Sequence, residues 1–132
     1  MGSSFGIKLI SVDRSLASTV QETRKVFPIS RGGMFGVKGD GRARRIYSDS
    51  PYEESKRFFQ SIIGAKVMPR MSLEELPNGK ILSRSDVVLS DGSRVVWRST
   101  TRDGTPAVSI KNKDQKLTEL TEYHNIHFEK RN

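Results

Sequence analysis

The segment Tyr123–Glu129 near the end of the chain carries both histidines of the sequence. Its alternation of apolar and polar residues is typical of a β-strand, in which successive side chains point to opposite faces. His124 then shares an apolar face with Ile126, whereas His127 lies on a polar face with Asn125. Because an imidazole titrates near neutral pH, His127 is a candidate general acid or base. His124 is the weaker candidate.

Three further side chains could act on a phosphate beside His127. Arg98 can bind a phosphate bidentately, and the hydroxyl groups of Thr100 and Ser109 can orient it. Metal-free cleavage of RNA needs a base for the 2′-hydroxyl, an acid for the leaving 5′-oxygen and cations for the phosphorane. These residues could provide such groups. The plainer alternatives are that His127 is a surface histidine and that Arg98 is a solvated charge at a strand end.

The charge of the chain favours an anionic partner. Its 132 residues include 23 basic and 15 acidic residues, which gives a formal net charge of +8. Such a charge concentrates polyanions around a protein. Nucleic acid is the leading candidate, and a basic domain without a special partner or an anionic membrane surface are the alternatives. We expect the following residues to contact RNA: Lys66, Lys111, Arg42, Arg44, Arg45 and Asn125.

Other classes of protein are disfavoured by what the sequence lacks. There is no cysteine, so neither a disulfide framework nor a thiolate metal site is expected. With two histidines, a zinc site would have to depend on carboxylates. No apolar run approaches the roughly 20 residues of a membrane-spanning helix, and no signal peptide is recognisable. We therefore expect no metal, no cofactor and no membrane contact.

One helix is indicated strongly. Ser50, Pro51 and Glu53 have the spacing of a capping box with proline in the first turn. Gly64 is a suitable residue just past the last turn. Between them lies an apolar stripe that should pack in the core: Phe58, Phe59, Ile62 and Ile63.

The segment before this helix differs in composition from the rest of the chain. Asp13 could cap a short helix over residues 14–26, which Pro28 would end. A glycine-rich stretch over residues 30–41 reads as a loop, since its glycines match neither a dinucleotide fingerprint nor a P-loop. The basic cluster Arg42–Arg45 that follows is interpreted as a solvated turn, with phosphate contact as the alternative.

Strands are predicted after the second helix, beginning with a short one at 65–68. Residues 85–89 and 94–98 flank Asp91-Gly92, which we interpret as a two-residue type I′ turn. That register pairs Leu89 with Arg94 and places Arg98 on the face of Val87. The strand 107–111 would carry Ser109 and Lys111 on its polar face. The prediction is an α+β domain with N-terminal helices packed on a twisted antiparallel sheet of about four to five strands.

Several motifs then occur in a recognisable order: DSPYEE (49–54), LPNGK (76–80), LSDGS (89–93), VWRS (96–99), DGTPAVSI (103–110) and IHF (126–128). Over residues 35–129 this order resembles the C-terminal toxin domains of bacterial polymorphic toxins, including those of contact-dependent growth inhibition and Rhs-type systems. Many of these domains are ribonucleases with the helix-plus-antiparallel-sheet fold of barnase, the EndoU nucleases, colicin tRNases and RelE-like toxins.

The resemblance implies a metal-independent endoribonuclease, often specific for tRNA. Such a toxin is delivered into the cytoplasm of a competing cell as part of a larger protein, and a cognate immunity protein neutralises it in the producer. We expect that immunity protein to be acidic and the toxin domain to be a monomer. Residues 1–35 would be a linker or a remnant of the delivery region, and residues 36–132 the nuclease domain.

The residues that match the family pattern are Arg98, Ser99 or Thr100, Ser109 and His127. The segment 97–101 departs from the expected tyrosine, arginine and proline, which leaves open which hydroxyl group faces the substrate. A non-catalytic RNA-binding module and a metal-dependent DNase remain alternatives, as does an ADP-ribosylating toxin. A deaminase is disfavoured because its cysteine pair is absent.

Overall fold

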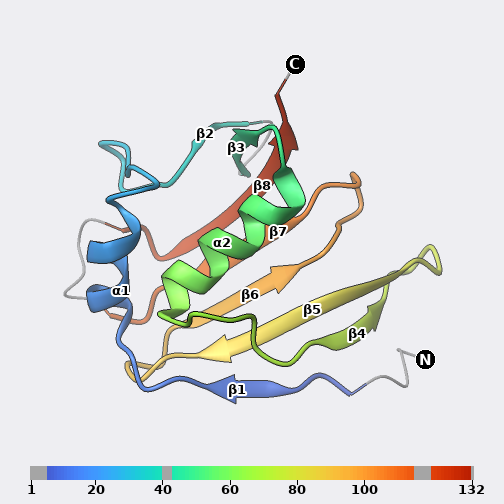
Figure 1. Cartoon of the computed structure of the whole chain (residues 1–132), viewed down its shortest axis with the longest axis horizontal. Helices are drawn as coiled ribbons and strands as arrows, with labels where there is room; N and C mark the ends of the chain where they lie inside the picture. The colour runs from blue at the N-terminus through green and yellow to red at the C-terminus, as the bar shows by residue number, and fades with distance from the viewer. Residues whose placement is uncertain (1–5, 40–42, 115–119, 132) are drawn as a thin grey trace.

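The computed structural model describes residues 6–39, 43–114 and 120–131, and within these ranges the chain forms two helices and one mixed sheet (Figure 1). Helix α1 spans Leu16–Thr23 and helix α2 spans Pro51–Ile63. The strands are β1 Leu9–Ser11, β2 Val37–Lys38, β3 Arg44–Ser48, β4 Ser72–Glu75, β5 Ile81–Val88, β6 Arg94–Arg98, β7 Ala107–Lys111 and β8 Tyr123–Lys130.

The sheet is larger than the sequence predicts. The α+β class is confirmed, but the described residues form eight strands in the order β1-β5-β6-β7-β8-β3-β2, with β4 also paired to β5. Neighbours from β5 to β8 are antiparallel, whereas β1 runs parallel to β5 and β3 runs parallel to β8. The prediction of a purely antiparallel sheet of four to five strands was wrong. Parallel pairing joins segments far apart in sequence, and local alternation carries no signal for it.

The β5–β6 hairpin differs from the predicted register by one residue. The Leu89 amide donates to the Ser93 carbonyl at 2.8 Å, and Val88 lies opposite Arg94. The loop therefore has three residues, Ser90 to Gly92, and Gly92 adopts a φ of +88°, as in a type I turn followed by a left-handed residue. Consequently Val87 pairs with Val95 under the helices. The predicted pairing of Leu89 with Arg94 was wrong.

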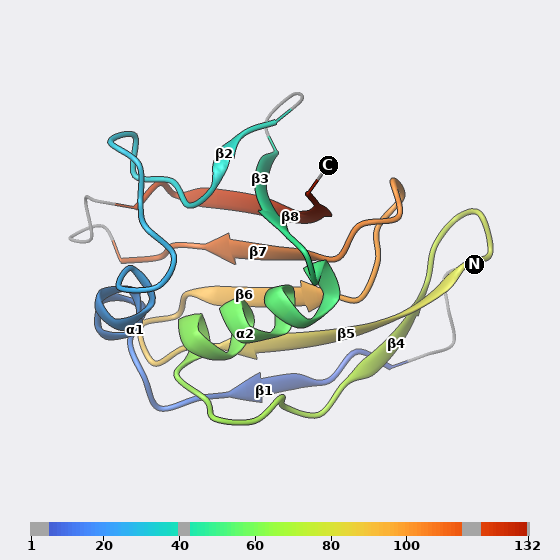
Figure 2. The ribbon, with the colours of Figure 1, turned by 45° about the horizontal axis from the view of Figure 1, so that its top comes forward.

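Helix α2 lies across the middle of the sheet (Figure 2). It begins at Pro51 and ends at Ile63, and the φ of +73° at the following Gly64 confirms the predicted C-terminal cap. The capping box does not form, because the Ser50 side chain makes no capping bond. Phe58 contacts the rings of Phe27, Phe35 and Phe128, and so joins α2 to the N-terminal segment and to β8.

Helix α1 is shorter than predicted and packs against α2. Ser15, not Asp13, accepts the hydrogen bond at its N-terminus, from the Ser18 amide at 3.3 Å. Leu16 and Val20 are fully buried in the same core as the apolar face of α2. Residues 65–68, where a strand was predicted, form no strand.

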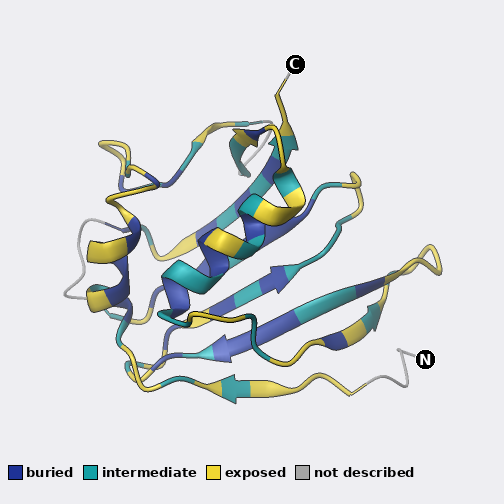
Figure 3. Cartoon of the chain, viewed as in Figure 1, coloured by how far each residue is buried: buried dark blue, intermediate teal, exposed yellow. Residues whose placement is uncertain are grey.

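The two faces of the sheet differ in character. Buried positions gather on the face beneath α2 (Figure 3). Trp97 is fully buried there and donates through Nε1 to Ser55 Oγ at 2.9 Å, so it belongs to the core. The opposite face carries polar side chains from β6, β7 and β8. No helix in the described ranges has the length and apolar character needed to cross a bilayer.

Candidate active site

Strand pairing arranges the polar face of the sheet into rows, because residues directly opposite each other on neighbouring strands point to the same side. The first row, which we name the His127 row, crosses β3, β8, β7, β6 and β5. Its members in order are Arg45, His127, Ala107, Arg98 and Arg84. Pairing alone therefore places the predicted base and the predicted phosphate ligand on one face.

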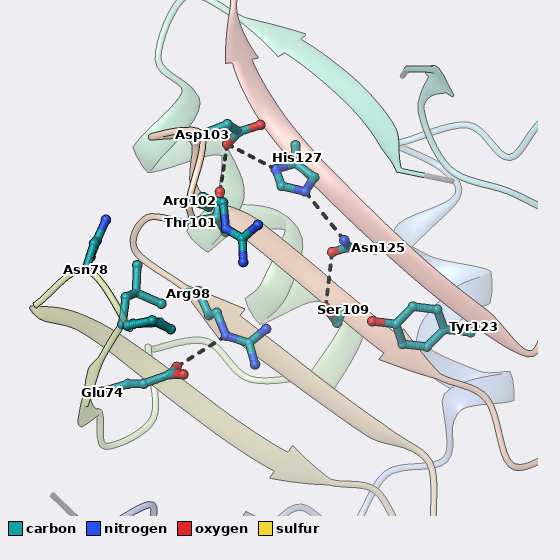
Figure 4. A pocket seen from close by; sticks show the side chains of 12 residues that line it. Glu74, Asn78, Arg98, Thr101, Arg102, Asp103, Ser109, Tyr123, Asn125 and His127 are labelled. Atoms are coloured by element: carbon teal, nitrogen blue, oxygen red, sulfur yellow. Dashed lines mark hydrogen bonds and ion pairs between the residues drawn. The ribbon is translucent and has the colours of Figure 1, made fainter. Parts of the chain in front are cut away.

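A cleft of about 930 Å³ lies over this face (Figure 4). It is lined by four predicted site residues: Arg98, Ser109, Asn125 and His127. Ser109 lies opposite Asn125 on the neighbouring row, and its hydroxyl donates to Asn125 Oδ1 at 3.2 Å. The predicted alternation of β7 and β8 is confirmed, with Val108 and Ile126 on the buried side.

His127 is held by the turn that follows β6. Its Nδ1 lies 2.7 Å from Thr105 Oγ1 and 3.6 Å from Asp103 Oδ1. The Thr105 hydroxyl donates to Asp103 at 2.6 Å, and the Thr101 hydroxyl also lies 2.8 Å from that oxygen. Although burial acts to raise the pKa of Asp103, the hydrogen bonds from Thr105 and Thr101 hold it far below its ordinary value. Asp103 is thus an anion at neutral pH.

These contacts determine the tautomer of His127. A hydroxyl group carries one proton, and a carboxylate can only accept. Because Thr105 donates to Asp103, Nδ1 of His127 must donate to Thr105. In the neutral ring Nε2 is then the acceptor, and Asn125 Nδ2 lies 3.4 Å from it. That contact is long, so a substrate hydroxyl could replace it.

The environment of His127 favours the neutral ring. Burial lowers its pKa from the ordinary value of 6.5, and the positive charge of Arg45 acts in the same direction. Asp103 and Glu129 oppose this shift without cancelling it. Near neutral pH the ring therefore presents a basic nitrogen at the cleft.

Arg98 is positioned by a carboxylate on β4. Its Nε lies 3.4 Å from Glu74 Oε1, the same oxygen that lies 2.8 Å from Arg84 Nη1. Arg84 also binds Asp86, and their hydrogen bond raises the pKa of Arg84. The ends of the Arg98 guanidinium extend into the cleft (Figure 4). This arrangement can present a cation to a bound anion.

Three other predicted site residues, Thr100, Lys66 and Lys111, do not line the cleft. Thr101, the neighbour of Thr100, does line it. Lys66 follows α2, on the helical side of the sheet. Lys111 is exposed on the face of the cleft, two residues from Ser109 on β7.

Arg44 and Arg45 of the basic cluster lie in strand β3, not in a solvated turn. Arg44 points to the helical side and donates to the carbonyls of Phe35 and Gly36. Arg45 lies beside His127 and forms 3.4 Å ion pairs with Asp103 and Glu129. Arg42, the third predicted RNA contact in the cluster, lies outside the described residues.

His124 is part of the core, as its apolar neighbours indicated. Its ring is fully buried, Nε2 accepts the Phe35 amide at 3.1 Å, and Nδ1 lies 3.0 Å from Thr121 Oγ1. Burial, with a contribution from the charge of Arg44, lowers its pKa to about 4. It stays neutral near pH 7 and faces away from the cleft.

Sequence reasoning did not identify five of the polar or aromatic residues at this site: Glu74, Arg102, Asp103, Thr105 and Tyr123. Tyr123 could have been found, since it alternates with Asn125 and His127 on one strand. The sequence around Asp103 and Thr105 indicates only a turn. Their contacts with His127 depend on how this turn folds over β8.

Within the described residues, no group of three or more His, Cys, Asp or Glu side chains is placed to hold a metal ion. Comparisons of the chain with protein-family models, with curated proteins and with solved structures found no match.

Proposed function

We propose that this chain is a toxin domain that cleaves RNA as a metal-independent endoribonuclease. One observation carries the proposal: a neutral imidazole, oriented through Thr105 by the anionic Asp103, opens its Nε2 to a cleft that also contains Arg98. An oriented base beside a guanidinium suits attack on a phosphodiester. The net charge of +8 supports a polyanionic substrate.

In the proposed reaction Nε2 of His127 takes the proton of the 2′-hydroxyl, and O2′ attacks the adjacent phosphorus. The O2′–P bond forms as the P–O5′ bond breaks, and the leaving 5′-oxygen takes a proton from water. The products are a 2′,3′-cyclic phosphate and a 5′-hydroxyl end. The imidazolium then returns its proton to solvent. Asp103 stabilises the imidazolium through Thr105 while it exists.

The neighbouring groups have supporting roles in this scheme. Arg98 binds the non-bridging oxygens and stabilises the charge that develops on them. Ser109, which already donates to Asn125, can turn its hydroxyl toward the same phosphate. Thr101 replaces Thr100 as the hydroxyl near the reaction, and it acts through Asp103.

The biological setting follows from the resemblance to polymorphic toxins. A tRNA substrate, delivery into a competing cell and a cognate immunity protein are therefore part of the proposal. Arg98 and Arg102, which line the cleft, and Lys111, which is exposed on the same face, would attract an acidic immunity protein that covers the site.

Expression of the whole chain in bacteria that lack an immunity partner tests the proposal. The whole chain is needed because Leu16 and Val20 belong to the core. Wild type should stop growth and fragment RNA, whereas His127→Ala should do neither. Arg57→Ala, on the exposed side of α2, should behave as wild type. Intact RNA in arrested cells, or loss of chromosomal DNA instead, would contradict the ribonuclease assignment.

A further inference from the structure

On the cleft face of the sheet, the His127 row is followed by the row of Asn125 and Ser109, and then by a third row. Tyr123 on β8 lies opposite Lys111 on β7, and Lys111 lies opposite Arg94 on β6. We name these three residues the Tyr123 row. Tyr123 and His127 are four residues apart on the same face of β8, so their backbones are about 13 Å apart. One nucleotide could not contact both side chains.

The Tyr123 row combines an exposed aromatic ring with two cations. Tyr123 lines the cleft with 58% of its surface exposed. Among the described residues, neither Lys111 nor Arg94 forms an ion pair, whereas Arg98, Arg84 and Arg45 all do. An exposed aromatic ring beside two uncompensated cations matches what a nucleotide offers, a base with a flat face and a phosphate with negative charge.

We infer that the Tyr123 row is a second nucleotide-binding subsite, and that the enzyme binds its RNA substrate at a single-stranded segment. The inference rests on the proposed ribonuclease function. A base stacks on Tyr123 while Lys111 and Arg94 bind the phosphate beside it, and the chain then runs past Asn125 to His127. A base inside a duplex is already stacked and paired, and so cannot present its face to the ring.

Binding of fluorescent single-stranded oligonucleotides tests the subsite without catalysis. Methylation of every 2′-oxygen removes the nucleophile, so binding is measured on RNA that cannot be cleaved. Tyr123→Ala should weaken binding about 5- to 150-fold, the range for loss of one base–aromatic stack. Tyr123→Phe should keep most of the affinity. Tyr47→Ala is the matched control, because Tyr47 is an exposed strand tyrosine outside the cleft lining.

Two further measurements identify the contacts. An abasic nucleotide moved along the oligonucleotide should abolish the effect of Tyr123→Ala at one position only. Lys111→Ala and Arg94→Ala should each reduce the slope of log affinity against log salt by about 1.

The outcomes separate this inference from the proposed function. If wild type cleaves RNA but Tyr123→Ala binds as well as wild type, the subsite is wrong and the ribonuclease stands. If wild type binds the single strand with the predicted dependence on Tyr123 but never cleaves unmodified RNA, the subsite stands and the ribonuclease fails. Equal affinity for single strand and duplex would overturn the inferred substrate.

Discussion

His127 and Arg98 lie on one row of the sheet, two strands apart, with Ala107 between them. Strand spacing separates their backbones by about 10 Å, a gap that two long side chains can bridge through a phosphate. Each is held by a carboxylate, His127 by Asp103 through Thr105 and Arg98 by Glu74. Both groups are thus oriented before a substrate enters.

Removal of the guanidinium should slow cleavage strongly. Arg98→Ala should reduce kcat by about 10²–10³-fold, as for loss of a group that stabilises transition-state charge. Arg98→Lys should recover only part of this, since an ammonium group cannot bind two oxygens as a fork. Rates on a defined RNA measure the effect, with Arg57→Ala as a control of the same residue type on α2. Full activity of Arg98→Ala would exclude Arg98 from the site.

The contact between Asp103 and His127 can be tested by pH. Because Asp103 acts to raise the pKa of His127, Asp103→Asn should lower that pKa further. The acid limb of the pH–rate profile should then move to lower pH, while the maximal rate falls about 10- to 100-fold with loss of a charge-assisted bond. NMR titration of His127 gives the pKa directly.

Two variants of Thr105 test the hydrogen bonds that link Asp103 to His127 through Thr105. Thr105→Val keeps the shape of the side chain but breaks the bonds to His127 and Asp103, so its loss of rate should match the loss expected for Asp103→Asn. Thr105→Ser keeps the hydroxyl and should remain close to wild type. Equal rates for the two Thr105 variants would show that these hydrogen bonds have no role in catalysis.

The sequence predicted the chemistry-bearing faces of β7 and β8 correctly, because alternation along one strand is a local property. The register between neighbouring strands was harder to predict from the sequence. The Asp91-Gly92 pair is compatible with a two-residue or a three-residue loop. The longer loop occurs where the Asp91 carboxylate accepts both the Ser93 amide and the Leu16 amide. Leu16 is distant in sequence, so no local pattern could reveal this.

The same limit explains the missed neighbours of His127. The arginine-rich sequence of Arg42–Arg45 indicates a solvated turn, whereas Arg44 and Arg45 begin strand β3. In the folded chain Arg44 satisfies two carbonyls and Arg45 pairs with two carboxylates. The two carboxylates, Asp103 and Glu129, come from a turn and a strand far away along the chain. Tertiary pairing here outweighs local composition.

Burial of His124 should make stability depend on pH. Its pKa falls from 6.5 to about 4 on folding, so between these pH values the unfolded chain binds a proton that the folded chain does not. The free energy of unfolding should therefore fall by about 3 kcal/mol as pH drops from 6.5 to 4, with little further loss from this residue below pH 4.

Urea unfolding at pH 7 and pH 4 measures this dependence, and His124→Gln should lack the part that His124 contributes. NMR titration of His124 in the wild type is an independent check, should the variant not fold. A pKa near 6.5 for the buried ring would contradict the expectation.

Cleavage of purified tRNA in the presence of EDTA, by wild type and by His127→Ala, tests the central claim most directly. We expect wild type to produce 2′,3′-cyclic phosphate ends without added metal, and His127→Ala to be about 10²–10⁴-fold slower. Equal rates for the two proteins, or cleavage by wild type only after magnesium is restored, would contradict the account.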